Sequence, residues 1–216
     1  MYANRQEAGR ALATLLAGRR WPPPLLVVAL PRGGVPVAVA VAQALKAPLD
    51  LVIVRKIGVP WQRELAMAAV AEGEPPQVAV EESVRASCGI DREEIERLAR
   101  GEMPEIGRRR RDYLGGRAPL PVEGRTVILV DDGLATGTTA RAALMSLRQR
   151  RPARLVLAVP VAPRDTLEAL RGEVDELVCP QVPAVFHAVG AHYQDFEQVG
   201  DEEVVRALRA FDRGVS

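Results

Sequence analysis

The amino-acid sequence predicts an α/β fold in which a mainly parallel sheet is flanked by helices. Aliphatic segments with little polar alternation, typical of strands buried on both faces, alternate along the chain with segments of helical periodicity. Hydrophobic residues make up 48% of the 216 residues and aromatic residues 4%, so the core should be sizeable and mostly aliphatic. This length suits one domain over residues 1–216 with a small appendage.

Capping signals and apolar spacing locate the individual elements. Asn4 with Glu7, and Asp91 with Glu94, form capping boxes that open two helices, and Asp201 is expected to cap a third. The strands expected are 25–30, 51–54, 66–71, 77–80, 127–130, 155–161 and 176–179. The helices expected are one from residue 5, 36–45, 91–114 with a break near Gly101 and Pro104, 139–149, 165–170 and one from residue 201.

The segment from Val127 to Ala140, VILVDDGLATGTTA, combines four chemical features in one short run. A buried strand is followed by Asp131 and Asp132 at its carboxyl end, where open α/β sheets bind ligands. Glycines and threonine hydroxyls then precede a helix start, and the unpaired amides of a helix N-terminus attract anions. The run indicates a ligand with an anion for the amides and with hydroxyls or a divalent metal for the carboxylates. A phosphorylated sugar meets that description.

Other interpretations of this run are weaker. It contains neither GxGxxG nor GxxxxGKS/T, which excludes the dinucleotide and P-loop fingerprints. An acid pair also follows a strand in phosphate-accepting regulatory domains, but the threonine-rich turn has no role there. A plain turn with a capping threonine leaves the glycine and hydroxyl spacing unexplained. The run closely resembles the phosphoribosyl pyrophosphate motif of the type I phosphoribosyltransferases, which has four apolar residues, two acids and a Thr/Gly phosphate loop.

Two further segments gain meaning from this resemblance. In ALPRGGVPVA, Arg32, Gly33 and Gly34 follow a buried strand, so amides can approach an anion beside a positive charge. Alone this is a weak signal, but the resemblance implies the family's pyrophosphate loop, which often carries a cis peptide. Arg55 and Lys56 follow the strand expected at 51–54 and would face the same crevice as the acids. Without the resemblance, these two residues would be interpreted as ordinary surface charges. The resemblance implies instead that they lie near the diphosphate of the substrate.

The resemblance implies transfer of ribose 5-phosphate from phosphoribosyl pyrophosphate to a nitrogenous acceptor, expected to be a nucleobase, with release of pyrophosphate. Asp131 and Asp132 would hold the ribose hydroxyls and Mg²⁺, and Lys56 would join them as a catalytic residue. The implied substrate-binding residues are Arg32, Gly33, Gly34, Arg55, Lys56, Asp131, Asp132, Ala135, Thr136, Gly137, Thr138 and Thr139. Two alternatives remain: a non-catalytic regulatory protein that binds phosphoribosyl pyrophosphate, and a component of a larger nucleotide-pathway complex.

The acceptor is less well indicated. Phe186, His192 and Tyr193 follow the last expected core strand, where related salvage enzymes place an aromatic residue that stacks on a purine. No aspartate stands where the purine-reading acid would be, which puts guanine or hypoxanthine use in doubt. His192 is a candidate acceptor contact or proton carrier, but we favour structural or exposed roles for both His187 and His192. Tyr193 and Phe196 are expected in the core.

A charged segment at about 81–117 interrupts the regular alternation, so we expect a helical lid, hood or dimer element there. Its run from Arg108 to Arg111 has two interpretations. A solvated helix face, with Glu105 pairing Arg109 four residues later, is favoured because charge runs are usually exposed. The alternative has one or two guanidiniums reaching pyrophosphate, for which arginine forks are well shaped.

Composition limits the remaining possibilities. The formal net charge of +1 argues against nucleic acid or membrane as the main partner. Cys88 and Cys179 are far apart, without metal-ligand spacing, and are expected to be small buried residues in a reducing cytosol. No signal peptide or apolar spanning run opens the chain. We therefore expect a cytoplasmic protein. A homo-oligomer is expected as well, although composition does not indicate it.

Overall fold

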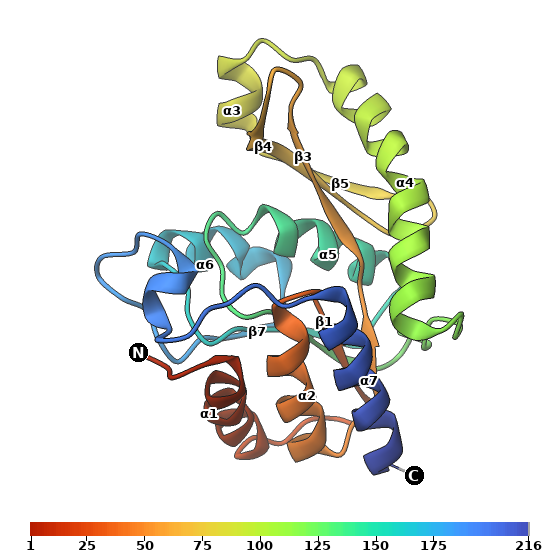
Figure 1. Ribbon diagram of the computed structural model, residues 1–216, viewed down its shortest axis with the longest axis vertical. Coiled ribbons are helices and arrows are strands. Elements are labelled where there is room, and N and C mark those ends of the chain that lie inside the picture. The colour runs from red at the N-terminus through yellow and green to blue at the C-terminus, as the bar shows by residue number, and fades with distance from the viewer. Residues whose placement is uncertain (216) are drawn as a thin grey trace.

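The core of the protein is a five-stranded parallel sheet, seen in the computed structural model, which describes residues 1–215 (Figure 1). Its strands are β1 (Leu25–Ala29), β2 (Leu49–Leu51), β6 (Thr126–Val130), β7 (Arg154–Ala158) and β8 (Glu176–Val178). They lie in the order β2-β1-β6-β7-β8, and neighbouring strands pair in parallel. The predicted α/β fold with a mainly parallel sheet is confirmed.

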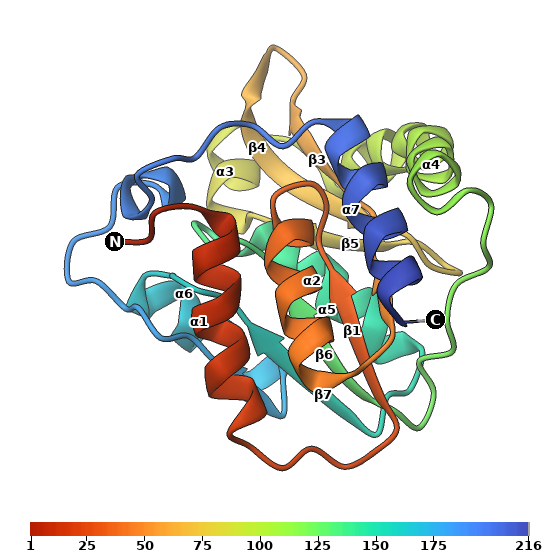
Figure 2. The ribbon, with the colours of Figure 1, turned by 60° about the horizontal axis from the view of Figure 1, so that its bottom comes forward.

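Helices cover both faces of this sheet. The helices α1 (Arg5–Ala17), α2 (Gly34–Leu45) and α7 (Asp201–Val215) lie on one face, as Figure 2 shows, and α5 (Thr138–Gln149) and α6 (Arg164–Leu170) lie on the other. Because successive strand residues point to opposite faces, Val27 packs in the cluster of Leu12, whereas Leu26 packs in the cluster of Leu144. Burial on both faces explains why the strands are continuous apolar runs. Two short 3₁₀ helices, η1 (Arg171–Glu173) and η2 (Val189–His192), lie in the connections.

A second, antiparallel sheet stands above the carboxyl ends of the core strands (Figure 1). It contains β3 (Val54–Val59), β4 (Gln62–Ala71) and β5 (Gln77–Val80), and it is followed by α3 (Glu82–Ser87) and α4 (Arg92–Leu114). We call residues 54–114 the hood. Ala69, Ala71 and Ala79 of the hood sheet pack with Ala142 of α5, and these small side chains let the sheet lie close to the helix.

The hood begins earlier in the chain than the sequence indicated. The strand expected at 51–54 is wrong, because β2 ends at Leu51 and β3 begins at Val54. Arg55 and Lys56 therefore open the first hood strand instead of ending a core strand. The strands expected at 66–71 and 77–80 exist, but they belong to the antiparallel sheet, where the first pairs with β3 and the second with β4. Apolar patterning reports burial and does not identify the partner strand.

The break expected near Gly101 and Pro104 is also wrong, because α4 runs through both residues. A proline inside a helix removes one backbone hydrogen bond and costs about 3 kcal/mol in an isolated helix. Here Ile95, Ile106 and Tyr113 are buried among core residues, so packing along the helix outweighs that cost.

Two of the three predicted caps are confirmed. The Asn4 side chain accepts a hydrogen bond from the amide of Glu7 at 2.9 Å, and Asp91 caps α4 in the same way. Asp201 is instead the first residue of α7, and its carboxylate accepts a hydrogen bond from the Tyr113 hydroxyl at 2.6 Å. That acid therefore joins α7 to α4.

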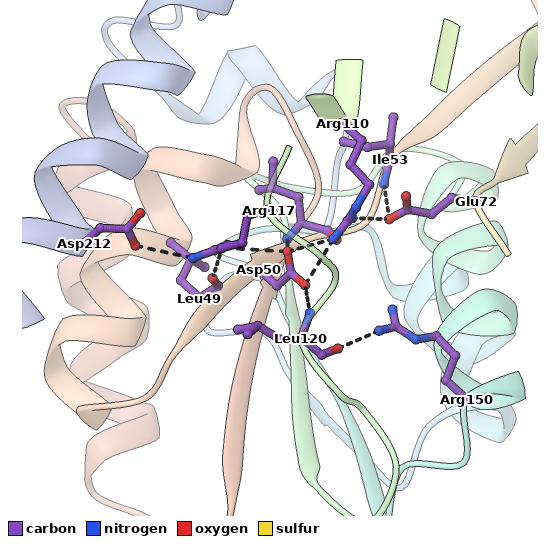
Figure 3. A network of polar contacts seen from close by, with 10 residues as sticks. Leu49, Asp50, Ile53, Glu72, Arg110, Arg117, Leu120, Arg150 and Asp212 are labelled. Carbon is purple, nitrogen blue, oxygen red and sulfur yellow. Dashed lines mark hydrogen bonds and ion pairs between the residues drawn. The ribbon is translucent and has the colours of Figure 1, made fainter. Parts of the chain in front are cut away.

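The arginine run of α4 divides between two environments. Arg109 pairs with Glu105 at 2.8 Å, which confirms the expected pair. The interpretation as a solvated face is wrong for Arg110, whose guanidinium lies 2.7 Å from Glu72 and 3.1 Å from the buried Asp50 (Figure 3). Burial raises the pKa of Glu72 although Arg110 lies beside it. These contacts fasten the hood to the edge of the core sheet.

The Asp50 carboxylate is the centre of that fastening. It also accepts hydrogen bonds from the amides of Leu51 and Leu120, both at 2.8 Å or less, and Arg117 lies 3.9 Å away (Figure 3). Only 2% of its side chain is exposed, so the positive charges around it offset the cost of burying an anion.

The two cysteines are free and half-buried. Burial raises the pKa of the Cys179 thiol to about 11.

Among the described residues, no helix has both the length and the apolar character needed to cross a membrane.

Candidate active site

The sheet topology creates a ligand crevice between β1 and β6. These strands are adjacent and in register, with Ala29 beside Val130, yet the chain continues from β1 to β2 on one side and from β6 to β7 on the other. In open α/β sheets, ligands bind outside the carboxyl ends of strands at such a point of divergence. A cavity of about 760 Å³ lies there, bounded by the core loops and by the hood.

Most of the predicted site residues surround this one cavity. Its lining includes Arg32, Gly33, Lys56, Asp131, Asp132, Ala135, Thr136, Gly137, Thr138 and Thr139. Two predicted residues lie outside the lining. Arg55 turns toward α4, where its guanidinium pairs with Glu102 at 2.8 Å, and Gly34 is buried beneath the loop that follows β6.

The acid pair is held by contacts on both of its members. The amide of Asp132 donates a hydrogen bond to Oδ1 of Asp131 at 2.8 Å. Oδ2 of Asp132 lies 2.7 Å from Nε of Arg5, and the Tyr193 hydroxyl donates to the Asp132 carbonyl at 2.5 Å. Both carboxylates are therefore oriented by the protein before any ligand enters.

Burial changes the protonation behaviour of these acids. Burial, and next the charge of Asp132, raise the pKa of Asp131 well above its ordinary value. Burial likewise raises the pKa of Asp132, although the hydrogen bond and charge of Arg5 oppose that rise. Two adjacent carboxylates with little exposure favour an added cation or hydroxyl donors, either of which would stabilise their charged forms.

The loop at 135–139 has the geometry of an anion site. Gly137 has a φ of +79°, in the left-handed region, and is the N-cap of α5. The first amides of this helix have no partner within it and lie at the positive end of its dipole. The Thr166 hydroxyl donates to the Ala135 carbonyl at 2.5 Å, which pins the loop to α6.

A hood residue reaches this loop. Glu81 lies directly after β5, and its carboxylate accepts a hydrogen bond from the Thr138 hydroxyl. The hydroxyls of Thr136 and Thr138 are 3.0 Å apart, so the two threonines and the acid form a chain. The anion loop is thus contacted by a carboxylate of the same protein.

The turn after β1 closes the opposite side of the crevice. The peptide bond between Pro31 and Arg32 is cis, as the resemblance implies. A Cβ at Gly33 would lie 2.0 Å from Oδ2 of Asp132, and one at Gly34 would lie 2.8 Å from the Val130 carbonyl oxygen. Glycine is therefore required at both positions for α2 to start this close to the acid pair.

The segment before α7 supplies the remaining wall of the cavity. Val189, Phe196, Gln198 and Val199 line the cavity. Tyr193 is buried, as predicted, whereas Phe196, also expected in the core, is only partly buried and lines the cavity.

The two histidines differ in their surroundings. His187 is exposed, and His192 stacks on Phe186 with ring centres 5.2 Å apart. Neither histidine is among the residues that line the cavity, which agrees with the structural or exposed roles that the sequence favours.

The donor set suits Mg²⁺ bound together with a substrate. Within residues 1–215, no group of three or more His, Cys, Asp or Glu side chains is arranged to hold a metal ion. Mg²⁺ is usually bound by one or two carboxylates, with substrate phosphates and waters completing its octahedron. Asp131 and Asp132 offer such a pair of carboxylates beside the cavity.

Sequence reasoning missed Arg5, Glu81 and the wall at 196–199. Arg5 lies 127 residues from its partner Asp132, and no local pattern reports such a contact. For Glu81 a signal existed, since it is an acid that directly follows a predicted strand, as Asp131 does.

An acid pair, a glycine- and threonine-rich loop at a helix start and cations thus lie together at the divergence point, as in proteins of the α/β class that bind ligands there. The profile of the phosphoribosyl transferase domain matches residues 2–195. The chain therefore belongs to the phosphoribosyl transferase domain family.

Relatives agree with this assignment. A Mycobacterium tuberculosis protein provisionally named as a phosphoribosyl transferase is 42% identical over 211 residues, covering 96% of this chain. The chain spans 46% of the length of that relative. A bifunctional protein PyrR from Herpetosiphon aurantiacus is 41% identical over 115 residues, covering 52% of this chain and 56% of the relative.

Solved structures give the same picture of the fold. The crystal structure of TT1426 from Thermus thermophilus has a TM-score of 0.79 and 40% identity, and the match covers 97% of this chain and 98% of that one. The AQ2163 protein from Aquifex aeolicus shares the fold with a TM-score of 0.51 at 12% identity, covering 94% of this chain and 86% of that one.

Proposed function

We propose that this protein transfers ribose 5-phosphate from phosphoribosyl pyrophosphate to a nitrogenous acceptor, with release of pyrophosphate and with Mg²⁺ as the cofactor. The observation that carries the proposal is the convergence of three chemistries on one cavity: the acid pair, the threonine loop and the cations Arg32 and Lys56. Together these groups would supply partners for the phosphate, the ribose and the diphosphate of that substrate.

The threonine loop and the acids hold the part of the substrate that is transferred. The 5-phosphate binds the amides at the start of α5 and the hydroxyls of Thr136, Thr138 and Thr139. Asp131 and Asp132 accept hydrogen bonds from the ribose hydroxyls or share Mg²⁺ with them. Binding energy from the remote phosphate orients the anomeric carbon for reaction.

The other side of the cavity stabilises the leaving group. Arg32 and Lys56 line it, and their charges attract the diphosphate as its bond to the ribose lengthens. Bound Mg²⁺ supplies further positive charge to the diphosphate oxygens. Arg55 is not part of this set, since its guanidinium pairs with Glu102.

The wall at the end of the chain supports a flat acceptor. Val189, Phe196 and Val199 are apolar, and Gln198 adds an amide that can donate and accept. A nucleobase combines an apolar ring with hydrogen-bonding edges, so we propose a nucleobase as the acceptor.

Pyrophosphate release from phosphoribosyl pyrophosphate and Mg²⁺, measured across a panel of purine and pyrimidine bases, tests this function. We expect one base to raise the release well above hydrolysis, and the double variant Asp131→Asn, Asp132→Asn to abolish the increase. Tight binding of phosphoribosyl pyrophosphate without release for any base would instead favour a regulatory protein that senses this metabolite.

A further inference from the structure

We infer that Arg5 is a positioning residue that makes the two acids of the site unequal, and this inference rests on the proposed function. Its guanidinium contacts three parts of the site. Nε lies 2.7 Å from Oδ2 of Asp132, Nη1 donates to the Glu197 carbonyl at 2.7 Å, and the guanidinium carbon lies 3.8 Å from the centre of the Phe196 ring. Arg5 belongs to the first turn of α1, whose start is fixed by the Asn4 cap.

The Asp132 carboxylate is held from two sides. Arg5 engages Oδ2, and the same oxygen occupies the space where a Cβ of residue 33 would lie, at 2.0 Å. Only glycine at that position leaves room for the carboxylate. Oδ2 is thereby committed to the protein, and Oδ1 is the oxygen of Asp132 left for a ligand.

Asp131 has different neighbours. It accepts a hydrogen bond from the Asp132 amide, and the charge of Lys56 in the hood acts on it. The side chain of Lys56 is exposed, in contrast to the Arg5 side chain, of which 10% is exposed. Asp131 thus shares the cavity with an exposed cation on the proposed diphosphate side, whereas Asp132 pairs with a fixed cation on the proposed acceptor side.

The same guanidinium links the acid to the acceptor wall. It lies over the Phe196 ring, an arrangement stabilised by the attraction between a cation and an aromatic face. Its hydrogen bond to Glu197 fixes the backbone beside that ring. Arg5 therefore sets the distance between the oxygen that contacts the ribose and the surface against which the acceptor lies.

A double-mutant cycle on Mg²⁺-dependent affinity for phosphoribosyl pyrophosphate tests this role. Arg5→Met should weaken binding about tenfold, as expected for the loss of a charge-assisted hydrogen bond. In a protein that already carries Asp132→Asn, Arg5→Met should lower the affinity little further. In a protein that carries Asp131→Asn, it should lower the affinity by the same tenfold as in the wild type. Arg5→Lys should recover part of the affinity, because a cation returns to the same place.

Controls separate positioning from folding. Arg10→Met removes an exposed arginine from the same helix and should leave affinity unchanged. Unfolding temperatures of all variants should remain close enough to the wild type for full folding at the assay temperature. A merely structural Arg5 would lower affinity by one factor in both acid backgrounds and would show no preference for Asp132.

The inference would be overturned if Arg5→Met lowered the affinity equally in the Asp131→Asn and Asp132→Asn variants, or if Arg5→Met alone kept wild-type affinity. Either result would leave the proposed function standing. A wild-type protein that binds no phosphoribosyl pyrophosphate would overturn the proposed function and this inference with it.

Discussion

The hydroxyl of Thr138 donates a hydrogen bond to the carboxylate of Glu81, so the hood delivers an acid to the loop that we propose for phosphate. A threonine hydroxyl has one hydrogen to donate. Because Thr138 gives its hydrogen to Glu81, Thr136 is the donor in the contact between the two threonines at 3.0 Å. Both hydroxyl hydrogens thus point along a chain that ends on the Glu81 carboxylate. A phosphate that binds these hydroxyls must displace that carboxylate.

Glu81→Gln should tighten the binding of inorganic phosphate. Two like charges about 4 Å apart repel each other by about 1 kcal/mol even in water, which corresponds to roughly a fivefold change in affinity. Isothermal titration with phosphate measures the effect. Glu82→Gln is the matched control, because Glu82 is the next residue and pairs with Arg85 and Arg92 instead. Equal or weaker phosphate binding in Glu81→Gln would contradict the idea that Glu81 and phosphate compete for the threonine hydroxyls.

Gly137→Val should block the phosphate loop. The left-handed φ of +79° strains any side chain, and a Cβ there would lie 2.9 Å from Cγ2 of Thr166. Crystals soaked in sulfate should show the anion at the start of α5 in the wild type and lose it in the variant. Gly172→Val, at a position with open space, serves as the control. A sulfate that remains at the loop in Gly137→Val would exclude this loop as the phosphate site.

Asp131→Asn and Asp132→Asn should each weaken Mg²⁺-dependent binding of phosphoribosyl pyrophosphate and leave the fold intact. Both acids line the cavity, and an amide is a far poorer ligand for Mg²⁺ than a carboxylate. Titration at fixed Mg²⁺, compared with titration in EDTA, gives the metal-dependent part of the affinity. The central role of the acids fails if both variants bind as the wild type does.

Asp50→Ala should destabilise the protein by about 3–5 kcal/mol, because it removes the buried anion that lies between Arg110 and Arg117 and that accepts the Leu120 amide. The measurement is urea denaturation followed by circular dichroism. Glu123→Ala breaks an exposed pair with Arg151 and should change stability by less than about 1 kcal/mol. Similar losses in the two variants would mean that the network of Figure 3 does not fasten the hood.

The sequence predicted those parts of the site that are contiguous in the chain. Asp131, Asp132 and the loop from Ala135 to Thr139 belong to one strand–loop–helix unit, so local patterns contain their geometry. Arg32 and Gly33 are predictable for the same reason, since they follow the neighbouring strand β1. In each case a parallel strand ends where its side chains reach the crevice.

Residues that depend on tertiary contacts could not be predicted in this way. Arg55 and Lys56 are adjacent, but successive residues of a strand point to opposite faces. Lys56 therefore lines the cavity while Arg55 turns to Glu102. Arg110 sits in an exposed-looking charge run, and only the fold brings Asp50 to it.

The comparison of Lys56→Ala with the wild type tests the central claim, that the cavity performs transfer and does not only bind. Lys56 lines the cavity on the proposed diphosphate side. An enzyme must hold the departing pyrophosphate more tightly as negative charge develops on it, whereas a sensor needs only affinity for the intact ligand. With the best base of the panel, we expect Lys56→Ala to lower the rate of pyrophosphate release about a hundredfold, with a much smaller change in affinity for phosphoribosyl pyrophosphate. Tight binding by the wild type with no base-dependent release of pyrophosphate would contradict the account.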